Sequence, residues 1–381
     1  MCKDISLFIL CLPFSPFIYL YNLCFHRKVK EIESGKKAKD ICEKILEENW
    51  TDNGYWASNK GYTDVWTRDS FFSLQMCEGD NPQEYVNKTK IYVQTLERYQ
   101  RGDGLIPLFI GTGDACCKLF CCKKPSGEIK PQYTDVKTGD TVTDSCFQYI
   151  ILKGKQDDMT EKAWEYMQKY VKDGLIYEEG LGSWMDTVKH KGHVLYTNML
   201  YYRAAYIMKP KLQTLIKDTI IEKLWSGQYF KCSTDITSFD QVGNALAMLW
   251  GVADENKIDK IKDYRQKYFN KGINNPPCLP LVRKVFLPCY ALGNYNYHNY
   301  GWSWVNLLFM YASKDFKDLG KFTEIIKKYD TIHEIYSCEK PVNRLFCESQ
   351  PDFSEAAGMY LLCEKENSNE NPKSNKLNFI F

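Results

Sequence analysis

The chain has 381 residues, a net charge of +2, 44% hydrophobic residues and 26% charged residues. This length can bury a large core, and the near-neutral charge disfavours a nucleic-acid partner, which would require a basic stripe. Aromatic residues make up 15% of the chain, with 27 Tyr, 20 Phe and 9 Trp. Tyr and Trp suit carbohydrate pockets because they combine flat apolar faces with polar edges. A Tyr-rich core explains the same composition, so composition leaves both interpretations open.

The first 36 residues form a separate, hydrophobic N-terminal extension. Residues 5–25 carry no charge and are long enough to cross a bilayer as a helix. Basic residues follow at 27–30, so the positive-inside rule would place the rest of the chain in the cytoplasm. Pro13 and Pro16 would kink a spanning helix, so a shallow membrane anchor and a strap on the domain surface are the alternatives.

The sixteen cysteines do not resemble a disulfide framework, because the chain is far longer than the small secreted domains that need one. Several cysteines lie in apolar helical patterns, where a free thiol behaves as a small hydrophobic group: Cys42, Cys77, Cys146 and Cys363. We therefore expect a reducing, cytoplasmic compartment. The triplets Asn49-Trp-Thr51 and Asn87-Lys-Thr89 fit the glycosylation sequon and are weak evidence against it.

From Lys37 onward the spacing of apolar residues is mostly helical, with little of the alternation that strands show. About twelve helices are predicted. Their ranges are 37–48, 68–77, 82–99, 141–152, 161–172, 196–208, 211–224, 241–252, 258–268, 302–312, 316–329 and 353–363. Twelve helices in six hairpins can close into a ring, so we predict an all-α (α/α)6 toroid over residues 37–366. A charged linker at 31–36 precedes it, and a polar tail at 367–381 follows.

Polar and aromatic clusters stand just before several predicted helices or within their first turn. They occupy residues 64–69, 140–144, 182–186, 238–240 and 297–304. In a ring of hairpins, each inner helix reaches the central cavity through the loop that precedes it. We therefore expect these loops to carry the chemistry.

Residues 111–139 interrupt the helical pattern and predict a long loop over the cavity mouth. The loop contains Cys116-Cys117 and Cys121-Cys122. Four-thiolate zinc sites usually join pairs from separated segments, so a thiol-rich or acylated loop is favoured over zinc. The five histidines are scattered along the chain and suggest no metal site either; they are His26, His190, His193, His298 and His333. We therefore expect no metal and no cofactor.

Six short elements follow one another along the chain. They are Val65-Trp-Thr-Arg-Asp-Ser70, Gly104-Leu-Ile-Pro107, Gly182-Ser-Trp-Met-Asp186, Gly243-Asn-Ala-Leu-Ala247, Tyr297-His-Asn299 and Ser354-Glu-Ala-Ala-Gly-Met-Tyr-Leu361. Their order and spacing resemble the six-hairpin glycosidases, from about Lys37 to Cys363. That group includes the glucosidase domain of glycogen-debranching enzyme, alkaline/neutral invertases, processing α-glucosidase I and mannosylglycerate hydrolase.

The resemblance implies an inverting glycoside hydrolase that cleaves an α-linked sugar, with a glucosyl unit as the first expectation. The Trp-Met-Asp element matches the segment of the general acid, here Asp186. The segment Ile332-His-Glu-Ile-Tyr336 matches that of the general base, here Glu334. Arg68 and Asp69 match the pair that grips the sugar. The chain departs from the family at Phe353-Ser-Glu355, where Phe-Ser-Trp is frequent, so Glu355 stays a rival base.

Inverting hydrolysis suits two carboxyl groups that are remote in sequence, since acid and base lie roughly 6.5–9.5 Å apart around a water molecule. Trp184 and Met185 are expected to desolvate Asp186 and raise its pKa. A helix cap is the alternative for Asp186, and a solvated charge is the alternative for Glu334. The rivals of Glu334 as base are Glu355, Glu339 and Glu348.

Further polar and aromatic residues are predicted to bind the substrate. Arg68 and Asp69 could hold vicinal hydroxyls through charge-assisted bonds, with a local salt bridge as the alternative. The aromatic residues could form stacking walls, with core packing as the alternative for each Trp. His298 would bond a hydroxyl or orient a loop. The complete set is Tyr62, Trp66, Arg68, Asp69, Asp144, Trp184, Asn244, His298, Trp302, Trp304 and Glu355.

Two other functions are open on the same fold. A sugar epimerase or lyase is one, although an epimerase would use paired histidines and this chain has few. A non-catalytic carbohydrate-binding toroid is the other. In each case we expect a monomer with a carbohydrate ligand and no nucleic acid, in the cytoplasm, with membrane contact through residues 5–25 left open.

Overall fold

The computed structural model describes residues 28–75, 82–111, 129–135, 139–281, 297–344 and 347–368. The predicted membrane segment 5–25, Cys77 and the paired cysteines at 116–117 and 121–122 lie outside these ranges. So does the polar tail from residue 369 onward.

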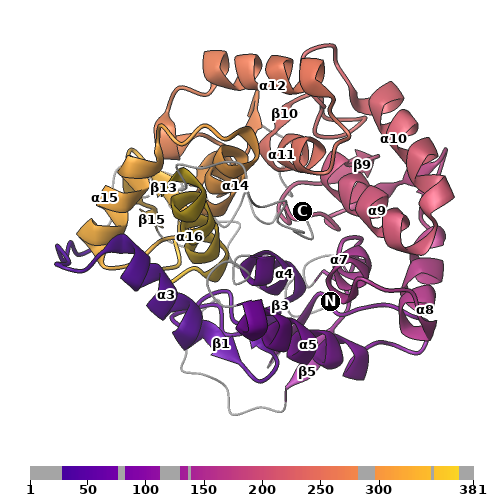
Figure 1. Ribbon diagram of the computed structural model, residues 1–381, viewed down its shortest axis with the longest axis horizontal. Helices are drawn as coiled ribbons and strands as arrows, with labels where there is room; N and C mark the ends of the chain where they lie inside the picture. The colour runs from indigo at the N-terminus through magenta and orange to yellow at the C-terminus, as the bar shows by residue number, and fades with distance from the viewer. Residues whose placement is uncertain are drawn as a thin grey trace, which may run out of the picture.

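The described residues contain twelve α-helices, and each matches a predicted one. They are α3 (Ala38–Asn49), α4 (Thr67–Gln75), α5 (Pro82–Arg98), α7 (Ser145–Lys153), α8 (Asp158–Gln168), α9 (Leu195–Met208), α10 (Pro210–Leu224), α11 (Gln241–Leu249), α12 (Glu255–Tyr268), α14 (Ser303–Ser313), α15 (Leu319–Tyr329) and α16 (Ser354–Ser368). Along the chain they alternate between an outer and an inner position, which confirms the (α/α)6 toroid (Figure 1).

The inner ring is closed by helix packing. Helix α4 packs on α7, α7 on α9, α9 on α11, α11 on α14, α14 on α16, and α16 again on α4. The outer helices α3, α5, α8, α10, α12 and α15 surround this ring (Figure 1). Each inner helix therefore has its N-terminus fixed relative to the other five.

The burial pattern explains which helices lie inside. Residues 145–152 of α7 and 241–248 of α11 are all buried, as expected of helices surrounded by protein. Outer α10 buries only one stripe, made by Ile216, Ile220 and Leu224 at four-residue spacing.

Several helix ends differ from their predicted positions because of local capping. Helix α8 starts at Asp158 rather than at residue 161, because Asp157 and Thr160 form a reciprocal capping box. Helix α12 starts at Glu255 because the side chain of Asp254 accepts a hydrogen bond from the backbone of Lys257.

Two predicted helices include residues that are not helical in the structure. Residues 141–144, predicted helical, precede α7, and Thr141 bridges to Thr134 instead. Residues 171–172, also predicted helical, form strand β6 (Val171–Lys172), which pairs with β7 (Leu175–Ile176). Apolar spacing alone did not distinguish these short strands from a continuing helix.

Short antiparallel strands join the loops at the inner-helix N-termini. The other sheets are β1 (Trp50–Thr51) with β2 (Gly54–Tyr55), β3 (Val65–Trp66) with β4 (Phe109–Gly111) and β5 (Lys130–Gln132), β8 (Glu178–Gly180) with β9 (His190–Gly192), β10 (Phe239–Asp240) with β11 (Cys278–Leu279), β12 (Gly301–Trp302) with β13 (Ile335–Ser337) and β14 (Lys340–Pro341), and β15 (Asn343–Arg344) with β16 (Cys347–Glu348). The pairing of Trp302 with Ile335 matters most, because it joins the start of α14 to the segment that follows Glu334.

The ring closes at a seam between the first helix and the last hairpin. Helix α3 packs on both α15 and α16 (Figure 1). At its end, the Asn49 side-chain amide donates to the Asp352 carbonyl at 2.7 Å and to Ser354 Oγ at 2.8 Å. The predicted linker is part of this seam, because Ile32 and Ser34 donate backbone bonds to the last turn of α15. Asn49 is fully buried, so its sequon is inaccessible, whereas Asn87 is exposed on α5.

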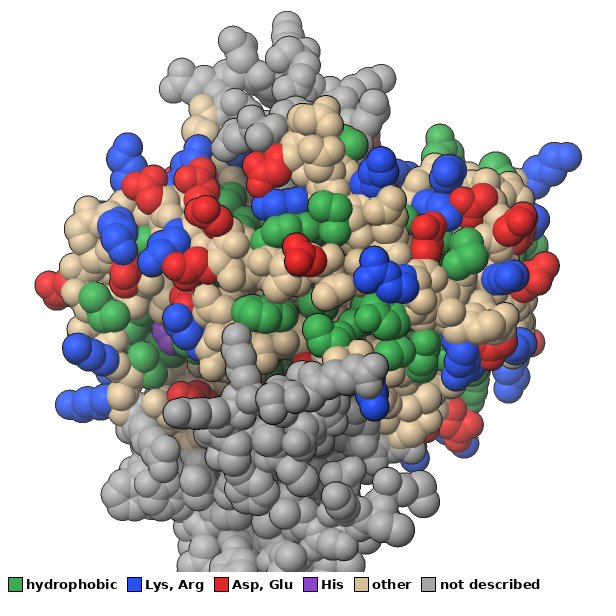
Figure 2. Space-filling model, turned by 90° about the horizontal axis from the view of Figure 1, so that it is seen from below, with side chains coloured by type: hydrophobic (Ala, Val, Ile, Leu, Met, Phe, Trp, Pro, Cys, Tyr) green, Lys and Arg blue, Asp and Glu red, His purple; other side chains and the backbone are tan. Residues whose placement is uncertain are grey.

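The described surface and interior fit an ordinary globular domain. On the face drawn in Figure 2, basic and acidic side chains are interspersed. Within the described ranges, no helix has both the length and the apolarity that crossing a bilayer needs. The described members of the predicted buried thiols, Cys42, Cys146 and Cys363, are buried and free.

Candidate active site

Ionisable side chains gather where the inner helices begin. Arg68 and Asp69 lie in the first turn of α4, and Asp144 immediately precedes α7. Asp240 caps α11 through its side chain, and Glu355 is the second residue of α16. The N-terminus of a helix carries a partial positive charge, so this end of the ring favours anionic groups.

Arg68 connects the starts of two of these helices with a third segment, the loop that contains Trp184. Its Nε donates to Asp144 Oδ2 at 3.1 Å, and Nη1 donates to the Trp184 carbonyl at 3.3 Å. Tyr196, in the first turn of α9, donates to the same Asp144 oxygen at 3.2 Å. Arg68 therefore ties α4 to α7 and to the loop that carries Asp186.

Asp186 contacts an imidazole and remains accessible. His298 Nε2 lies 3.3 Å from Asp186 Oδ1, and the Asp186 side chain is 34% exposed. The preceding Trp184 and Met185 are buried. Asp186 is therefore more exposed than the two residues that precede it.

Glu334 is held firmly from both main chain and side chain. Its backbone N–H donates to the Gln350 carbonyl at 2.9 Å, and its carbonyl accepts the Ser303 N–H at 3.0 Å. Tyr297 donates its phenol to Oε1 at 2.5 Å. The other carboxyl oxygen, Oε2, is buried and has no hydrogen-bond partner within the described ranges.

One short turn brings the two carboxyl groups into the same network. The 3-10 turn η3 (Tyr297–Asn299) supplies Tyr297 to Glu334 and the adjacent His298 to Asp186. Asp186 is also close enough to raise the pKa of Glu334. The two residues predicted as acid and base thus belong to one cluster.

Burial dominates the protonation of this cluster. Burial raises the pKa of Glu334 to about 8. The Tyr297 hydrogen bond lowers this pKa, whereas the charges of Asp69 and Asp186 raise it. Burial likewise raises the pKa of Asp69 to about 7, against the charge of Arg68. Burial and the neighbouring Asp69 carboxyl raise the pKa of Glu355 well above its ordinary value.

The predicted aromatic residues pack mainly on one another. Trp184 makes edge-to-face contacts with His298, Trp302 and Trp304, with centroids 5.3–5.6 Å apart. The His298 ring stacks on Trp302 at an interplanar angle of 8°. This packing fixes the imidazole that meets Asp186.

The remaining predicted residues lie in different surroundings. Trp66 is half-buried and packs on Phe109, and Tyr62 is half-buried close to Tyr297. Asn244 bonds to backbone: its Nδ2 donates to the carbonyls of Phe230 and Asp240, and its Oδ1 accepts the Phe230 N–H. Its amide therefore holds a loop, and we leave Asn244 out of the proposed site.

Sequence reasoning did not assign roles to several residues that the structure places in or beside the site. Tyr297 was visible as the neighbour of His298 in a Tyr-His-Asn element. Tyr196 and Glu178 gave no signal, although burial raises the pKa of Glu178 to about 7 close to Asp144 and Arg68. The rivals Glu339 and Glu348 are exposed, unlike Glu334 and Glu355.

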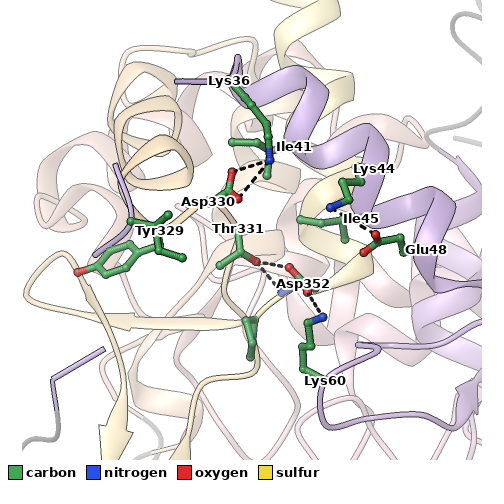
Figure 3. A pocket seen from close by; sticks show the side chains of 12 residues that line it. Lys36, Ile41, Lys44, Ile45, Glu48, Lys60, Tyr329, Asp330, Thr331 and Asp352 are labelled. Carbon is green, nitrogen blue, oxygen red and sulfur yellow. Dashed lines mark hydrogen bonds and ion pairs between the residues drawn. The ribbon is translucent and has the colours of Figure 1, made fainter. Parts of the chain in front are cut away.

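A separate cavity of about 270 Å³ lies at the seam, between α3 and the end of α15 (Figure 3). Lys36 pairs with Asp330 across it, while Lys60 and Thr331 both reach Asp352. These lysines and aspartates already pair with one another, so we interpret the cavity as part of the packing at the seam and not as a ligand site. Within the described ranges, no group of three or more His, Cys, Asp or Glu could hold a metal ion.

Comparison with known proteins agrees with this architecture. The chain is similar to a glycosidase variant solved in complex with glucose, at 12% identity and a TM-score of 0.57 over 86% of this chain and 95% of that chain. It is similar to a bacterial glucoamylase complexed with acarbose, at 14% identity and a TM-score of 0.59 over 87% of this chain and 55% of that chain.

A third similar structure is the GH63 mannosylglycerate hydrolase from Thermus thermophilus, at 12% identity and a TM-score of 0.50 over 85% of this chain and 99% of that chain. No protein-family model and no curated protein matches the chain. At these identities the likeness concerns the fold, and it confirms the predicted six-hairpin glycosidase fold.

Proposed function

We propose that the protein is an inverting glycoside hydrolase that cleaves an α-linked sugar, most readily a glucosyl unit. The observation that carries this proposal is the pairing of Asp186 and Glu334 with consecutive residues of η3. Two carboxyl groups remote in sequence thereby belong to one cluster, which supports their use as an acid and base pair.

The reaction follows from the roles of the two carboxyl groups. Asp186 gives its proton to the glycosidic oxygen as the bond from that oxygen to the anomeric carbon breaks. Glu334 removes a proton from a water molecule whose oxygen attacks the anomeric carbon from the opposite face. The products are the free alcohol and a sugar of inverted configuration, with one proton moved from Asp186 to Glu334 overall.

The surrounding residues suit these two steps. His298, fixed by Trp302 and Trp184, orients Asp186. Tyr297 opposes the burial that raises the pKa of Glu334 to about 8, and so favours the ionised form that the general base needs. Arg68 holds the Asp186 loop through the Trp184 carbonyl and keeps a positive charge beside the carboxyl groups.

A panel of α-linked disaccharides and aryl glycosides tests the proposal, with proton NMR recording which anomer is released first. The β-anomer is expected first, and Asp186→Asn and Glu334→Gln should each lower kcat by at least about 1,000-fold. Glu339→Gln and Glu348→Gln are matched controls, because both carboxyl groups are exposed, and they should retain activity.

The outcomes distinguish the alternatives. Release of the α-anomer first would contradict inversion. Sugar binding without any turnover would favour the non-catalytic carbohydrate-binding toroid. An epimerised or unsaturated sugar among the products would favour the epimerase or lyase.

A further inference from the structure

Glu355 occupies a position that the fold defines tightly. The preceding residue, Ser354, donates its hydroxyl to the Trp56 carbonyl at 2.6 Å and its backbone N–H to the Ala57 carbonyl at 2.9 Å. Asn49 donates to the same hydroxyl at 2.8 Å. The first turn of α16 is therefore anchored to the end of α3, and the helix α16 packs against α4 and α14.

The carboxyl oxygen Oε1 of Glu355 is buried and has no hydrogen-bond partner within the described ranges, and the residue is only 2% exposed. A buried polar group without a partner costs free energy, so native proteins rarely retain one without a reason. The Ser354 contacts show that the helix start is well packed, so a loose local structure does not explain it.

The charges around Glu355 are mostly of its own sign. Helix α4 contributes Asp69 and Arg68, and the segment before β13 contributes Glu334. The start of α7 contributes Asp144, and α9 contributes the phenol of Tyr196. Arg68 is the cation of this set, and it is already bonded to Asp144 and to a backbone carbonyl.

This setting separates the two buried glutamates. Glu334 receives a hydrogen bond from Tyr297, which stabilises a carboxylate, whereas Oε1 of Glu355 has no such donor among the described residues. A protonated carboxyl has one hydroxyl donor and one carbonyl acceptor, which together match a sugar hydroxyl, itself both acceptor and donor. An uncharged Glu355 can therefore remain buried until such a partner arrives.

We propose that Glu355 is a substrate-binding residue that holds a hydroxyl of the sugar beside Glu334 as a neutral carboxylic acid, and that it is not the base. This inference rests on the proposed function. It also explains why Phe353-Ser-Glu355 differs from the Phe-Ser-Trp that is frequent in the six-hairpin glycosidases. A Trp offers a flat apolar face to the sugar, whereas Glu355 offers a group that binds a hydroxyl.

Sugar binding in an Asp186→Asn background tests the inference without turnover. The probes are D-glucose and D-mannose with their monodeoxy analogues, measured by titration calorimetry. Glu355→Gln keeps one donor set and one acceptor, so it should bind within about threefold of its parent. Glu355→Met keeps the volume but removes both groups, so it should bind at least about tenfold more weakly.

A monodeoxy analogue locates the contact. For the analogue that lacks the hydroxyl held by Glu355, the parent and Glu355→Met should bind equally well. Circular dichroism checks the fold of both variants, and both should unfold at a higher temperature than the parent at pH 8, because a buried acidic group has been removed.

The inference is overturned if Glu355→Met binds every sugar as tightly as its parent. It is also overturned if Glu355→Gln loses as much affinity as Glu355→Met, because a carboxylate would then be required. If the parent binds none of the sugars, the proposed function fails as well. The two failures are distinguishable, because the parent still binds sugar when only the inference fails.

Discussion

The Tyr297 hydroxyl lies 2.5 Å from Glu334 Oε1 and donates its hydrogen bond to that oxygen. The contact joins the turn η3, which lies before α14, to the segment between α15 and α16. It is the largest influence that opposes burial, which raises the pKa of Glu334.

Replacing Tyr297 by Phe is expected to move the acid limb of the kcat/KM profile to higher pH. The hydrogen bond lowers the pKa of Glu334, so its loss raises that pKa, and the base ionises only at higher pH. A shift of about one pH unit corresponds to one hydrogen bond to a charged group. The measurement is kcat/KM from pH 5 to about 10.5 on the best substrate of the panel, a range that covers the limb before and after the shift.

The control for this prediction is Tyr229→Phe, which removes a phenol hydroxyl that donates to the Thr237 carbonyl. Its profile should match that of the unchanged protein. An acid limb that stays in place in Tyr297→Phe would show that Glu334 is not the group that must ionise.

Stability is expected to fall as pH rises from 6.5 to 8. Burial raises the pKa values of Asp69, Glu178 and Asp240 to about 7 and that of Glu334 to about 8. Over this range the folded protein holds protons that the unfolded chain has released, so the free energy of unfolding decreases with pH. Below pH 6.5 the buried His333, with its pKa lowered to about 3, acts in the opposite direction.

Urea unfolding at pH 6.5 and pH 8 measures this effect. The midpoint should be lower at pH 8, and Asp240→Asn should reduce the difference, because it removes one of the titrating groups. Equal midpoints at both pH values would contradict the protonated state of the buried carboxyl groups.

Asn49→Ala is expected to destabilise the protein by about 3 kcal/mol. The buried amide bonds to Asp352 and Ser354 and accepts a hydrogen bond from the Asn59 backbone, and all three partners would lose it. Chemical unfolding measures the change. Asn87→Ala on exposed α5 is the matched control, with an expected effect of at most about 0.5 kcal/mol.

Gly104→Ala is expected to cost more than about 2 kcal/mol. Gly104 has a φ of +101°, and a Cβ there would lie 2.1 Å from the Lys162 carbonyl oxygen of α8. Gly227→Ala is the control, because Gly227 has a similar φ of +96° with open space around it. A cost in Gly104→Ala no greater than in this control would show that the close approach to α8 is unimportant.

The sequence predicted the helices well because apolar spacing reports burial directly. In the structure, the single buried stripe on outer α10 contrasts with the almost continuous burial of inner α7 and α11. The resemblance added the order of the elements. The role of Gly104 became clear only from the structure, where its backbone lies close to Lys162 of α8. Just beyond this element, the Leu108 carbonyl accepts the Thr67 N–H at the start of the helix that carries Arg68.

The details of the site were less predictable, because they depend on the directions of side chains from irregular loops. Asn244 stands in the first turn of an inner helix, as a sugar ligand would, yet its amide bonds to Phe230. Tyr297 and Glu334 are far apart in sequence, and nothing local indicates that the phenol reaches that carboxyl group. Short strands such as β12 and β13 set this register, and two-residue strands leave almost no periodic signal.

The seam has a consequence for how the molecule assembles. Because Asn49 meets Asp352 and Ser354 across almost the whole described length, the last hairpin cannot complete its packing until the first helix is in place. Contacts between such distant residues slow folding, since a long loop must close before they form. Glu355 follows Ser354 directly, so the site would acquire its last carboxyl group at the moment when the two ends of the ring meet.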